Sequence, residues 1–209
     1  TRSKREVKIS FDEWNVWYHQ RKRDAERMRD WDWPEAPRLL EDIYNFEDVL
    51  QVGCIINTFI RRSDIVRIAC IAQLVNVIAP IMTDPGGSAW RQTIYWPFML
   101  ASKHGRGTAL QLAVEVPTYD AAAADKVPWL DIAGVHNSNA GTLADVALER
   151  FAAKSIEHTI IRHDDLEACN TKDTPDNVSP VKGNGAALSG KGMTLNLPPH
   201  SYSMVRVTL

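Results

Sequence analysis

The stretch Ile65-Val66-Arg67-Ile68-Ala69-Cys70-Ile71-Ala72 is a nearly continuous apolar run in the first half of the chain. Such a run is typical of a parallel β-strand buried on both faces, because helices cover both sides of a parallel sheet. The turn signal Asp84-Pro85-Gly86-Gly87 follows, and residues 93–104 can form a helix that ends before Gly105. The stretch therefore predicts one strand-helix unit of an α/β fold.

A second strand-helix unit precedes this one. Val7, Ile9 and Phe11 alternate with polar residues, which predicts a strand that ends near Glu13. A helix that closes at residues 61–62 is then indicated by an apolar stripe with steps of three or four residues. The stripe consists of Leu39, Ile43, Phe46, Leu50 and Cys54. Two such units in succession indicate α/β architecture with a parallel sheet.

The second half of the chain changes character. Its apolar runs are short and are separated by Pro, Gly, Asn and Asp, a pattern typical of an antiparallel β-sandwich. The predicted strands are residues 107–116, 129–135, 155–161, 193–197 and 203–209. We therefore expect an α/β part at residues 1–105 and an all-β part at residues 106–209.

Composition excludes several classes of function. The chain is 44% hydrophobic and 24% charged, as in ordinary globular proteins. Its net charge of -2 provides no basic field for nucleic acid, so we expect no nucleic-acid partner. The longest apolar run, Ile65–Met82, is interrupted by polar residues and a proline, so no membrane span is expected. The three cysteines show no CxxC spacing and no signal peptide is visible, which together predict a cytoplasmic protein.

The segment Phe11-Asp12-Glu13-Trp14-Asn15-Val16-Trp17-Tyr18-His19 holds the candidate chemistry. It places Glu13 at the carboxyl end of a strand, where α/β barrels carry their catalytic groups. Aromatic side chains follow at once, and their flat faces can pack against sugar rings. A regular strand would put Glu13 on the face of Val7, Ile9 and Phe11, pointing into the mouth of a barrel. The alternative is an exposed glutamate beside structural tryptophans.

This segment resembles the nucleophile motif of glycoside hydrolase family 51, the α-L-arabinofuranosidases. The resemblance extends over nearly the whole chain, in stretches that follow one another in the family's order. These stretches are residues 39–48, 68–81, 90–98, 156–158 and 197–201. The resemblance implies that the chain is the C-terminal portion of a (β/α)8 TIM barrel followed by a jelly-roll-like antiparallel β-sandwich.

Site residues follow from the resemblance position by position. Glu13 matches the nucleophile, Gln73 matches a residue that hydrogen-bonds the bound arabinofuranose, and Trp17 matches an aromatic residue that lines the pocket. An alternative for Gln73 is a polar residue that caps a buried strand. His19 and His104 are left out of the catalytic set, because a lone histidine is more often a surface or core residue.

Other side chains are weaker candidates. Trp31 and Trp33 could extend a substrate platform, and Trp90 could contribute a subsite. Asp164 and Asp165 are expected to face solvent. None of these five residues is included among the predicted site residues.

The chain departs from the family in two places. By resemblance its two strand-helix units are the seventh and eighth of the barrel, so the Asn-Glu pair that supplies the acid/base is missing. The family also has an additional strand segment after the stretch that resembles residues 132–137. We therefore expect a fragment that is inactive alone.

The implied activity is release of terminal α-L-arabinofuranosyl residues from arabinoxylan, arabinan and their oligosaccharides by a retaining mechanism. No metal or organic cofactor is expected, and a homo-oligomer is possible because family members often form one. One alternative is a non-catalytic remnant that binds sugar or a protein partner. Another is a relative that acts on xylosides or glucans.

Overall fold

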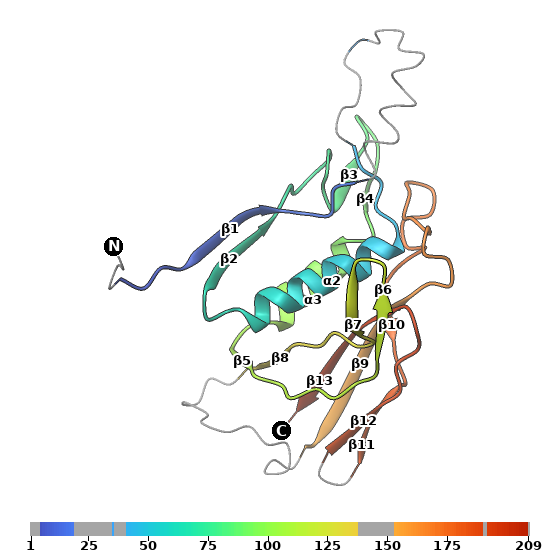
Figure 1. Ribbon diagram of the computed structural model, residues 1–209. Coiled ribbons are helices and arrows are strands. Elements are labelled where there is room, and N and C mark those ends of the chain that lie inside the picture. The colour runs from blue at the N-terminus through green and yellow to red at the C-terminus, as the bar shows by residue number, and fades with distance from the viewer. Residues whose placement is uncertain (1–4, 19–34, 36–40, 138–152, 190–191, 209) are drawn as a thin grey trace.

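The computed structural model describes residues 5–18, 35, 41–137, 153–189 and 192–208 (Figure 1). The elements in chain order are β1 (Ile9–Trp14), α2 (Phe46–Arg61), β2 (Val66–Ile71), β3 (Ile81–Thr83), β4 (Ala89–Arg91), α3 (Tyr95–His104), β5 (Thr108–Leu110), β6 (Thr118–Ala121), β7 (Ala124–Pro128), β8 (Gly134–His136), β9 (Ser155–Arg162), β10 (Val181–Lys182), β11 (Ala186–Ser189), β12 (Gly192–Leu195) and β13 (Ser201–Thr208). Strands dominate the second half, as expected.

Strands β1 and β2 pair in parallel, as the sequence predicts, with Ile9 opposite Val66 and Trp14 opposite Ile71. Helices α2 and α3 cover one side of this pair (Figure 1). The expectation that β2 is buried on both faces is wrong for the described residues. Ile68 is 52% exposed, and Arg67 and Cys70 are exposed too. No described element packs on the side of the pair away from the helices, and no described strand pairs with the outer edge of β1 or of β2.

Helix α2 begins at Phe46, later than the predicted start at Leu39, which lies outside the described residues. Asn45 and Asp48 fix this start through a capping box. The Asn45 side chain accepts from the Asp48 N–H at 3.1 Å, and the Asp48 carboxylate accepts from the Asn45 N–H at 2.8 Å. Ile43 therefore lies before the helix and is 46% exposed, so the predicted stripe is wrong at this point.

The second half has a sandwich-type arrangement of antiparallel strands. Its largest described sheet has the order β10-β9-β13, and β9 pairs with β13 along eight residues, from Ser155 opposite Thr208 to Arg162 opposite Ser201. Two-stranded sheets form from β5 and β8, from β6 and β7, and from β11 and β12. The predicted strand 107–116 is reduced to β5, and β6, β7, β10 and β11 were not predicted. The family's additional strand segment is expected to be missing from this chain after residue 137, and that place falls in residues 138–152, outside the described part.

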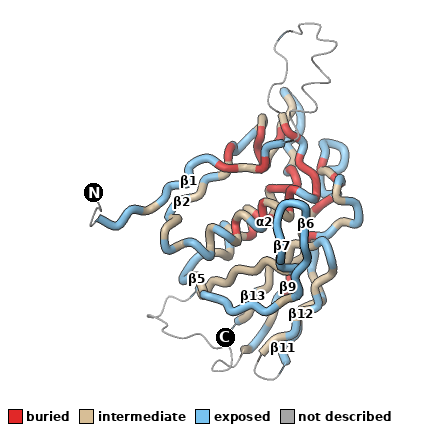
Figure 2. The backbone as a smooth tube through the Cα atoms, viewed as in Figure 1, coloured by how far each residue is buried: buried red, intermediate tan, exposed pale blue. Residues whose placement is uncertain are grey.

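Helix α2 packs against both halves of the chain. One core cluster joins Trp14 of β1 with α2, and a second joins α2 with β9 and the segment around Val178. An added Cβ on Gly53 would lie 2.6 Å from Cδ2 of Tyr202 on β13, so glycine permits the helix to approach this strand closely. The buried residues accordingly gather around α2 and the segments beside it (Figure 2).

Polar contacts also join the two halves. The Trp96 indole donates to the Val178 carbonyl at 2.9 Å, and Arg61 pairs with Asp131 at 2.6 Å. The halves thus form one packed unit.

Within the described residues, no helix has the length and apolar character that a membrane crossing requires.

His158 of β9 is a buried histidine in the second half, only 7% exposed. Its Nδ1 accepts from the Gly185 N–H at 3.3 Å, and its Nε2 lies 3.1 Å from the Ser203 hydroxyl. Burial lowers the pKa of His158 below its ordinary value of 6.5, because desolvation disfavours the charged imidazolium. Protonation at Nδ1 would also place two donors against each other at Gly185.

The lowered pKa predicts a pH-dependent stability. The unfolded chain binds this proton more readily than the folded chain, so the stability is present above pH 6.5 and is lost as the pH falls below it. We expect the Tm to fall as the pH drops below about 6.5, and the fall to be smaller in His158→Gln. His104, whose pKa is lowered by burial too, should leave a residual slope. If the Tm of the parent and that of His158→Gln fall equally with falling pH, the pH dependence does not come from His158.

Candidate active site

The carboxyl ends of β1 and β2 bring two predicted site residues to the same edge. Glu13 is the penultimate residue of β1, and Gln73 is the second residue after β2. Both side chains are exposed, and neither forms a hydrogen bond within the described part of the chain. A carboxylate and an amide are therefore available to a ligand at this edge.

The predicted orientation of Glu13 relative to Phe11 needs correction. Phe11 and Trp14 both contact the ring of Phe59 on α2, with centroids 5.2 and 5.1 Å apart. Strict alternation would place Phe11 and Trp14 on opposite faces. The pairing register between β1 and β2 shifts between these two residues. Glu13 therefore lies in an irregular end of the strand, and its exposure does not follow from a face shared with Phe11.

The aromatic residues of the motif separate into buried and exposed side chains. Trp14 is 7% exposed and belongs to the core, so the alternative of a structural tryptophan describes this residue. Trp17 is 54% exposed and offers aromatic surface. Tyr18 accepts from the Gln51 amide of α2 at 3.5 Å, and desolvation, with Asp48 as the next cause, raises the pKa of Tyr18 to about 12. Tyr18 therefore remains a neutral phenol at ordinary pH.

The loop that carries Gln73 is anchored by buried or half-buried polar side chains. The Asn15 amide donates to the carbonyls of Ala72 at 2.5 Å and Ile78 at 2.6 Å. The Gln92 amide donates to the Ala79 carbonyl at 2.8 Å. The peptide bond between Ala72 and Gln73 is cis. Asn15 was not predicted, although its position directly after Glu13-Trp14 in the motif was an available signal.

The weaker candidates lie away from this edge or outside the described residues. His104 ends α3, and burial, with Arg206 of the sandwich part as the next cause, lowers its pKa. Trp90 is half-buried in β4 and pairs with Met82 of β3. Asp164 pairs with Arg162 and its side chain is 85% exposed, as expected of a solvent-facing residue. His19, Trp31 and Trp33 lie outside the described residues.

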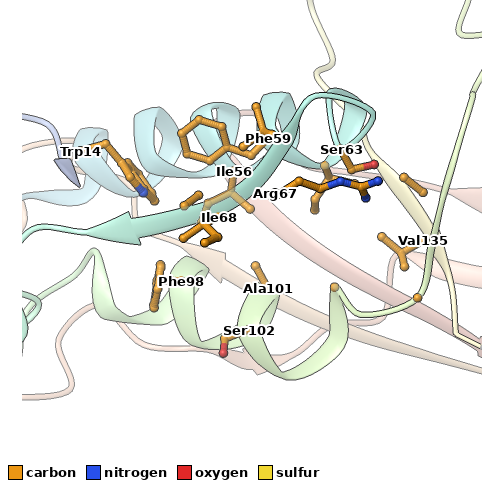
Figure 3. A pocket seen from close by; sticks show the side chains of 16 residues that line it. Trp14, Ile56, Phe59, Ser63, Arg67, Ile68, Phe98, Ala101, Ser102 and Val135 are labelled. Atoms are coloured by element: carbon orange, nitrogen blue, oxygen red, sulfur yellow. The ribbon is translucent and has the colours of Figure 1, made fainter. Parts of the chain in front are cut away.

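A cavity of about 320 Å³ lies on the helix side of β2, and its lining is mainly apolar (Figure 3). Phe59 and Ile68 face Phe98 and Ala101 across it, and Trp14 closes one end (Figure 3). Glu13 and Gln73 do not line it. No group of three or more His, Cys, Asp or Glu side chains within the described ranges could hold a metal ion. The candidate active site is therefore at the exposed carboxyl ends of β1 and β2, where Glu13 and Gln73 lie.

A carboxylate and an amide at the carboxyl ends of adjacent parallel strands define a site of the kind found in α/β barrel enzymes. Comparison with known proteins identifies the family. Residues 12–201 match the model of the "Alpha-L-arabinofuranosidase C-terminal domain". The chain thus belongs to glycoside hydrolase family 51, the α-L-arabinofuranosidases, and matches their C-terminal part.

Individual relatives agree with this assignment. The intracellular exo-α-(1→5)-L-arabinofuranosidase 1 of Bacillus subtilis is 40% identical over 221 residues, which cover 99% of this chain and 43% of the relative. The intracellular exo-α-(1→5)-L-arabinofuranosidase of Streptomyces lividans is 42% identical, with 98% of this chain and 33% of the relative covered. A solved family 51 α-L-arabinofuranosidase from Bifidobacterium longum superposes with a TM-score of 0.81 at 32% identity, covering 98% of this chain and 44% of that one. The chain therefore spans less than half the length of these relatives.

Proposed function

We propose that this chain supplies the nucleophile of a retaining α-L-arabinofuranosidase. The observation that carries the proposal is the exposed carboxylate of Glu13 at the end of β1, at the same end of the strand pair as Gln73, which follows β2. The Glu13 carboxylate attacks the anomeric carbon and forms an arabinofuranosyl-enzyme ester. Gln73 and Trp17 bind the sugar, the first through its amide and the second through its ring. Activity on an aryl α-L-arabinofuranoside tests this function.

The second carboxylic acid of this mechanism is proposed to lie outside these 209 residues. It protonates the leaving oxygen and then, as a base, activates the water that hydrolyses the ester. In retaining enzymes the two carboxyl groups lie about 5–5.5 Å apart. The C-terminal position of the family match supports this division of the catalytic pair.

We also propose that β1 and β2 are neighbouring strands of a (β/α)8 barrel. Their parallel pairing supports this, together with the apolar surface they expose. Ile9 is 41% exposed, Phe11 is 42% exposed and Ile68 is 52% exposed. Further strand-helix units would bury this surface and remove the free edges of the pair. The proposed boundary between the barrel part and the sandwich part is Gly105, the cap residue directly after α3.

Proposed substrates are arabinofuranosyl side chains or ends of arabinan, arabinoxylan and their oligosaccharides. The relatives' names support this class, since several are exo-α-(1→5)-L-arabinofuranosidases and one from Bifidobacterium longum is an exo-α-(1→6)-L-arabinofuranosidase. A cytoplasmic location is supported by the word intracellular in several of those names. Assays on matched aryl xylosides and glucosides separate this proposal from a relative with another sugar preference.

Replacing Gln73 by alanine should weaken sugar binding without removing the reaction. One lost hydrogen-bonding side chain costs about 1–3 kcal/mol, which lowers kcat/KM roughly 5- to 150-fold. The measurement is steady-state kinetics on an aryl arabinofuranoside with the enzyme extended to the length of its relatives. Gln111→Ala is the matched control, because this exposed glutamine lies in the second half. An unchanged kcat/KM in Gln73→Ala would mean that Gln73 does not bind the sugar.

A further inference from the structure

We propose that Asn15 is a positioning residue that fixes the nucleophile strand relative to the loop bearing Gln73. The proposal rests on the function proposed above. Asn15 is two residues after Glu13, and the carbonyl of Ala72, one of its acceptors, belongs to the residue before Gln73. One half-buried side chain thus joins the two backbone segments that present the candidate nucleophile and the candidate sugar-binding amide.

The bonding capacity of the Asn15 amide is used on the backbone. Its nitrogen donates to the carbonyls of Ala72 at 2.5 Å and Ile78 at 2.6 Å, and its oxygen accepts from the Val16 N–H at 2.8 Å. An amide has two N–H donors, so both are engaged. These bonds determine the side-chain conformation and hold both ends of residues 72–78. Neither alanine nor a carboxylate can reproduce them.

The position of Asn15 along the strand pair explains why such a side chain is needed. Backbone pairing between the strands ends with the Ala72 N–H donating to the Trp14 carbonyl at 2.9 Å. Directly beyond this bond, the Asn15 side chain replaces the backbone ladder as the link between the segments. Tyr44 and Gln92 also bond this loop, through the carbonyls of Ile78 and Ala79, but they attach it to other parts of the chain. Beyond the backbone bond between Ala72 and Trp14, the described link to the Glu13 segment therefore depends on Asn15.

The same bonding pattern occurs at Asn170, far along the chain from the strand ends. Its amide donates to the carbonyls of Arg91 at 3.1 Å and Val178 at 2.9 Å, and its oxygen accepts from the Val178 N–H at 2.7 Å. Asn170 is buried, whereas Asn15 is partly buried. Asn170→Ala therefore removes an equivalent set of hydrogen bonds without touching the link between Glu13 and Gln73, which makes it a matched control.

The experiment compares Asn15→Ala and Asn170→Ala in the enzyme extended to the length of its relatives, with an aryl α-L-arabinofuranoside as substrate. Both variants should lower the Tm. Only Asn15→Ala should lower kcat, by about 10- to 100-fold, with a smaller change in KM, because misplacing the reacting groups by about 1 Å has effects of this size. Asn15→Asp should lower kcat at least as much as Asn15→Ala, since its carboxylate would face two carbonyl oxygens. Equal kcat values for the two alanine variants would overturn the proposal.

Two further measurements keep the test decisive. If Asn15→Ala does not fold, Asn15→Ser retains one shorter donor and should show an intermediate loss of kcat; wild-type kcat in this variant would overturn the proposal. Hydrogen exchange of the Ala72 amide should accelerate in the Asn15 variants and stay unchanged in Asn170→Ala. This readout needs no turnover, so it tests the link even if the parent enzyme lacks arabinofuranosidase activity, a result that would reject the proposed function instead. Unchanged exchange at Ala72 would reject the link.

Discussion

Glu13→Ala in the enzyme extended to the length of its relatives is expected to lower kcat on an aryl arabinofuranoside by more than about 10⁴-fold, because no covalent intermediate can form without the nucleophile. Glu13 is exposed at the end of β1, so removing its carboxylate should leave the core intact. Glu13→Gln keeps the size of the side chain and should be equally inactive. The Tm of both variants should stay close to that of the parent.

Azide distinguishes a lost nucleophile from a lost acid/base. In Glu13→Ala it can attack the anomeric carbon from the side that the carboxylate has vacated, and the product is then the inverted β-arabinofuranosyl azide. Rescue of an acid/base variant would instead give the retained azide. Glu157→Ala is the control, because this exposed carboxylate on β9 pairs with Arg206 in the second half. Hydrolysis by Glu13→Ala at the parent rate would reject the nucleophile assignment.

Strand pairing could be predicted from residue pattern, but helix ends and strand faces could not. The apolar run 65–72 gave β2 within one residue at each end, because a run of this length and composition suits few other structures. The start of α2 depended on whether Asn45 or an earlier residue capped it. That choice is made by reciprocal side-chain bonds with Asp48, and the apolar period alone does not reveal them.

The candidate site was predicted in part. Placing Glu13 and Gln73 at strand ends follows from the pattern, because parallel strands bring their carboxyl ends to one edge. The orientation of Glu13 could not be obtained this way, since the register shift after Phe11 breaks the alternation on which the prediction relied. Asn15 was missed because its partners are carbonyl groups, and carbonyl groups have no signature in a sequence. The hairpin β6–β7 was missed because its alanine-rich turn carries little strand propensity.

The 209-residue chain expressed alone is expected to show no arabinofuranosidase activity. General acid/base catalysis contributes roughly 10²–10⁴-fold, and under our proposal both that group and most of the sugar pocket lie outside this chain. The assay is an aryl arabinofuranoside at high enzyme concentration, run beside the extended enzyme. Turnover by the 209-residue chain within about a hundredfold of the extended enzyme would show that the acid/base lies within it.

Hydrogen exchange on the same chain tests the proposed barrel. Helix α2 packs against both halves and β9 pairs with β13 along its whole length, so these elements should be protected. Protection should be weak in β1 and β2, because Ile9, Phe11 and Ile68 are exposed and the outer edges of both strands pair with no described strand. In the extended enzyme both strands should become strongly protected.

Ile68→Lys provides a sharper form of this test. Ile68 is 52% exposed in this chain, so a lysine there should cost little stability and should reduce aggregation through the free edge of β2. In the extended enzyme the same lysine would be buried between the proposed barrel and its helices, and an unpaired buried charge should cost several kcal/mol. The Tm of the variant should therefore fall only in the extended enzyme. Equal tolerance in both chains would mean that no further part of the extended enzyme covers Ile68, and the proposed barrel would be wrong.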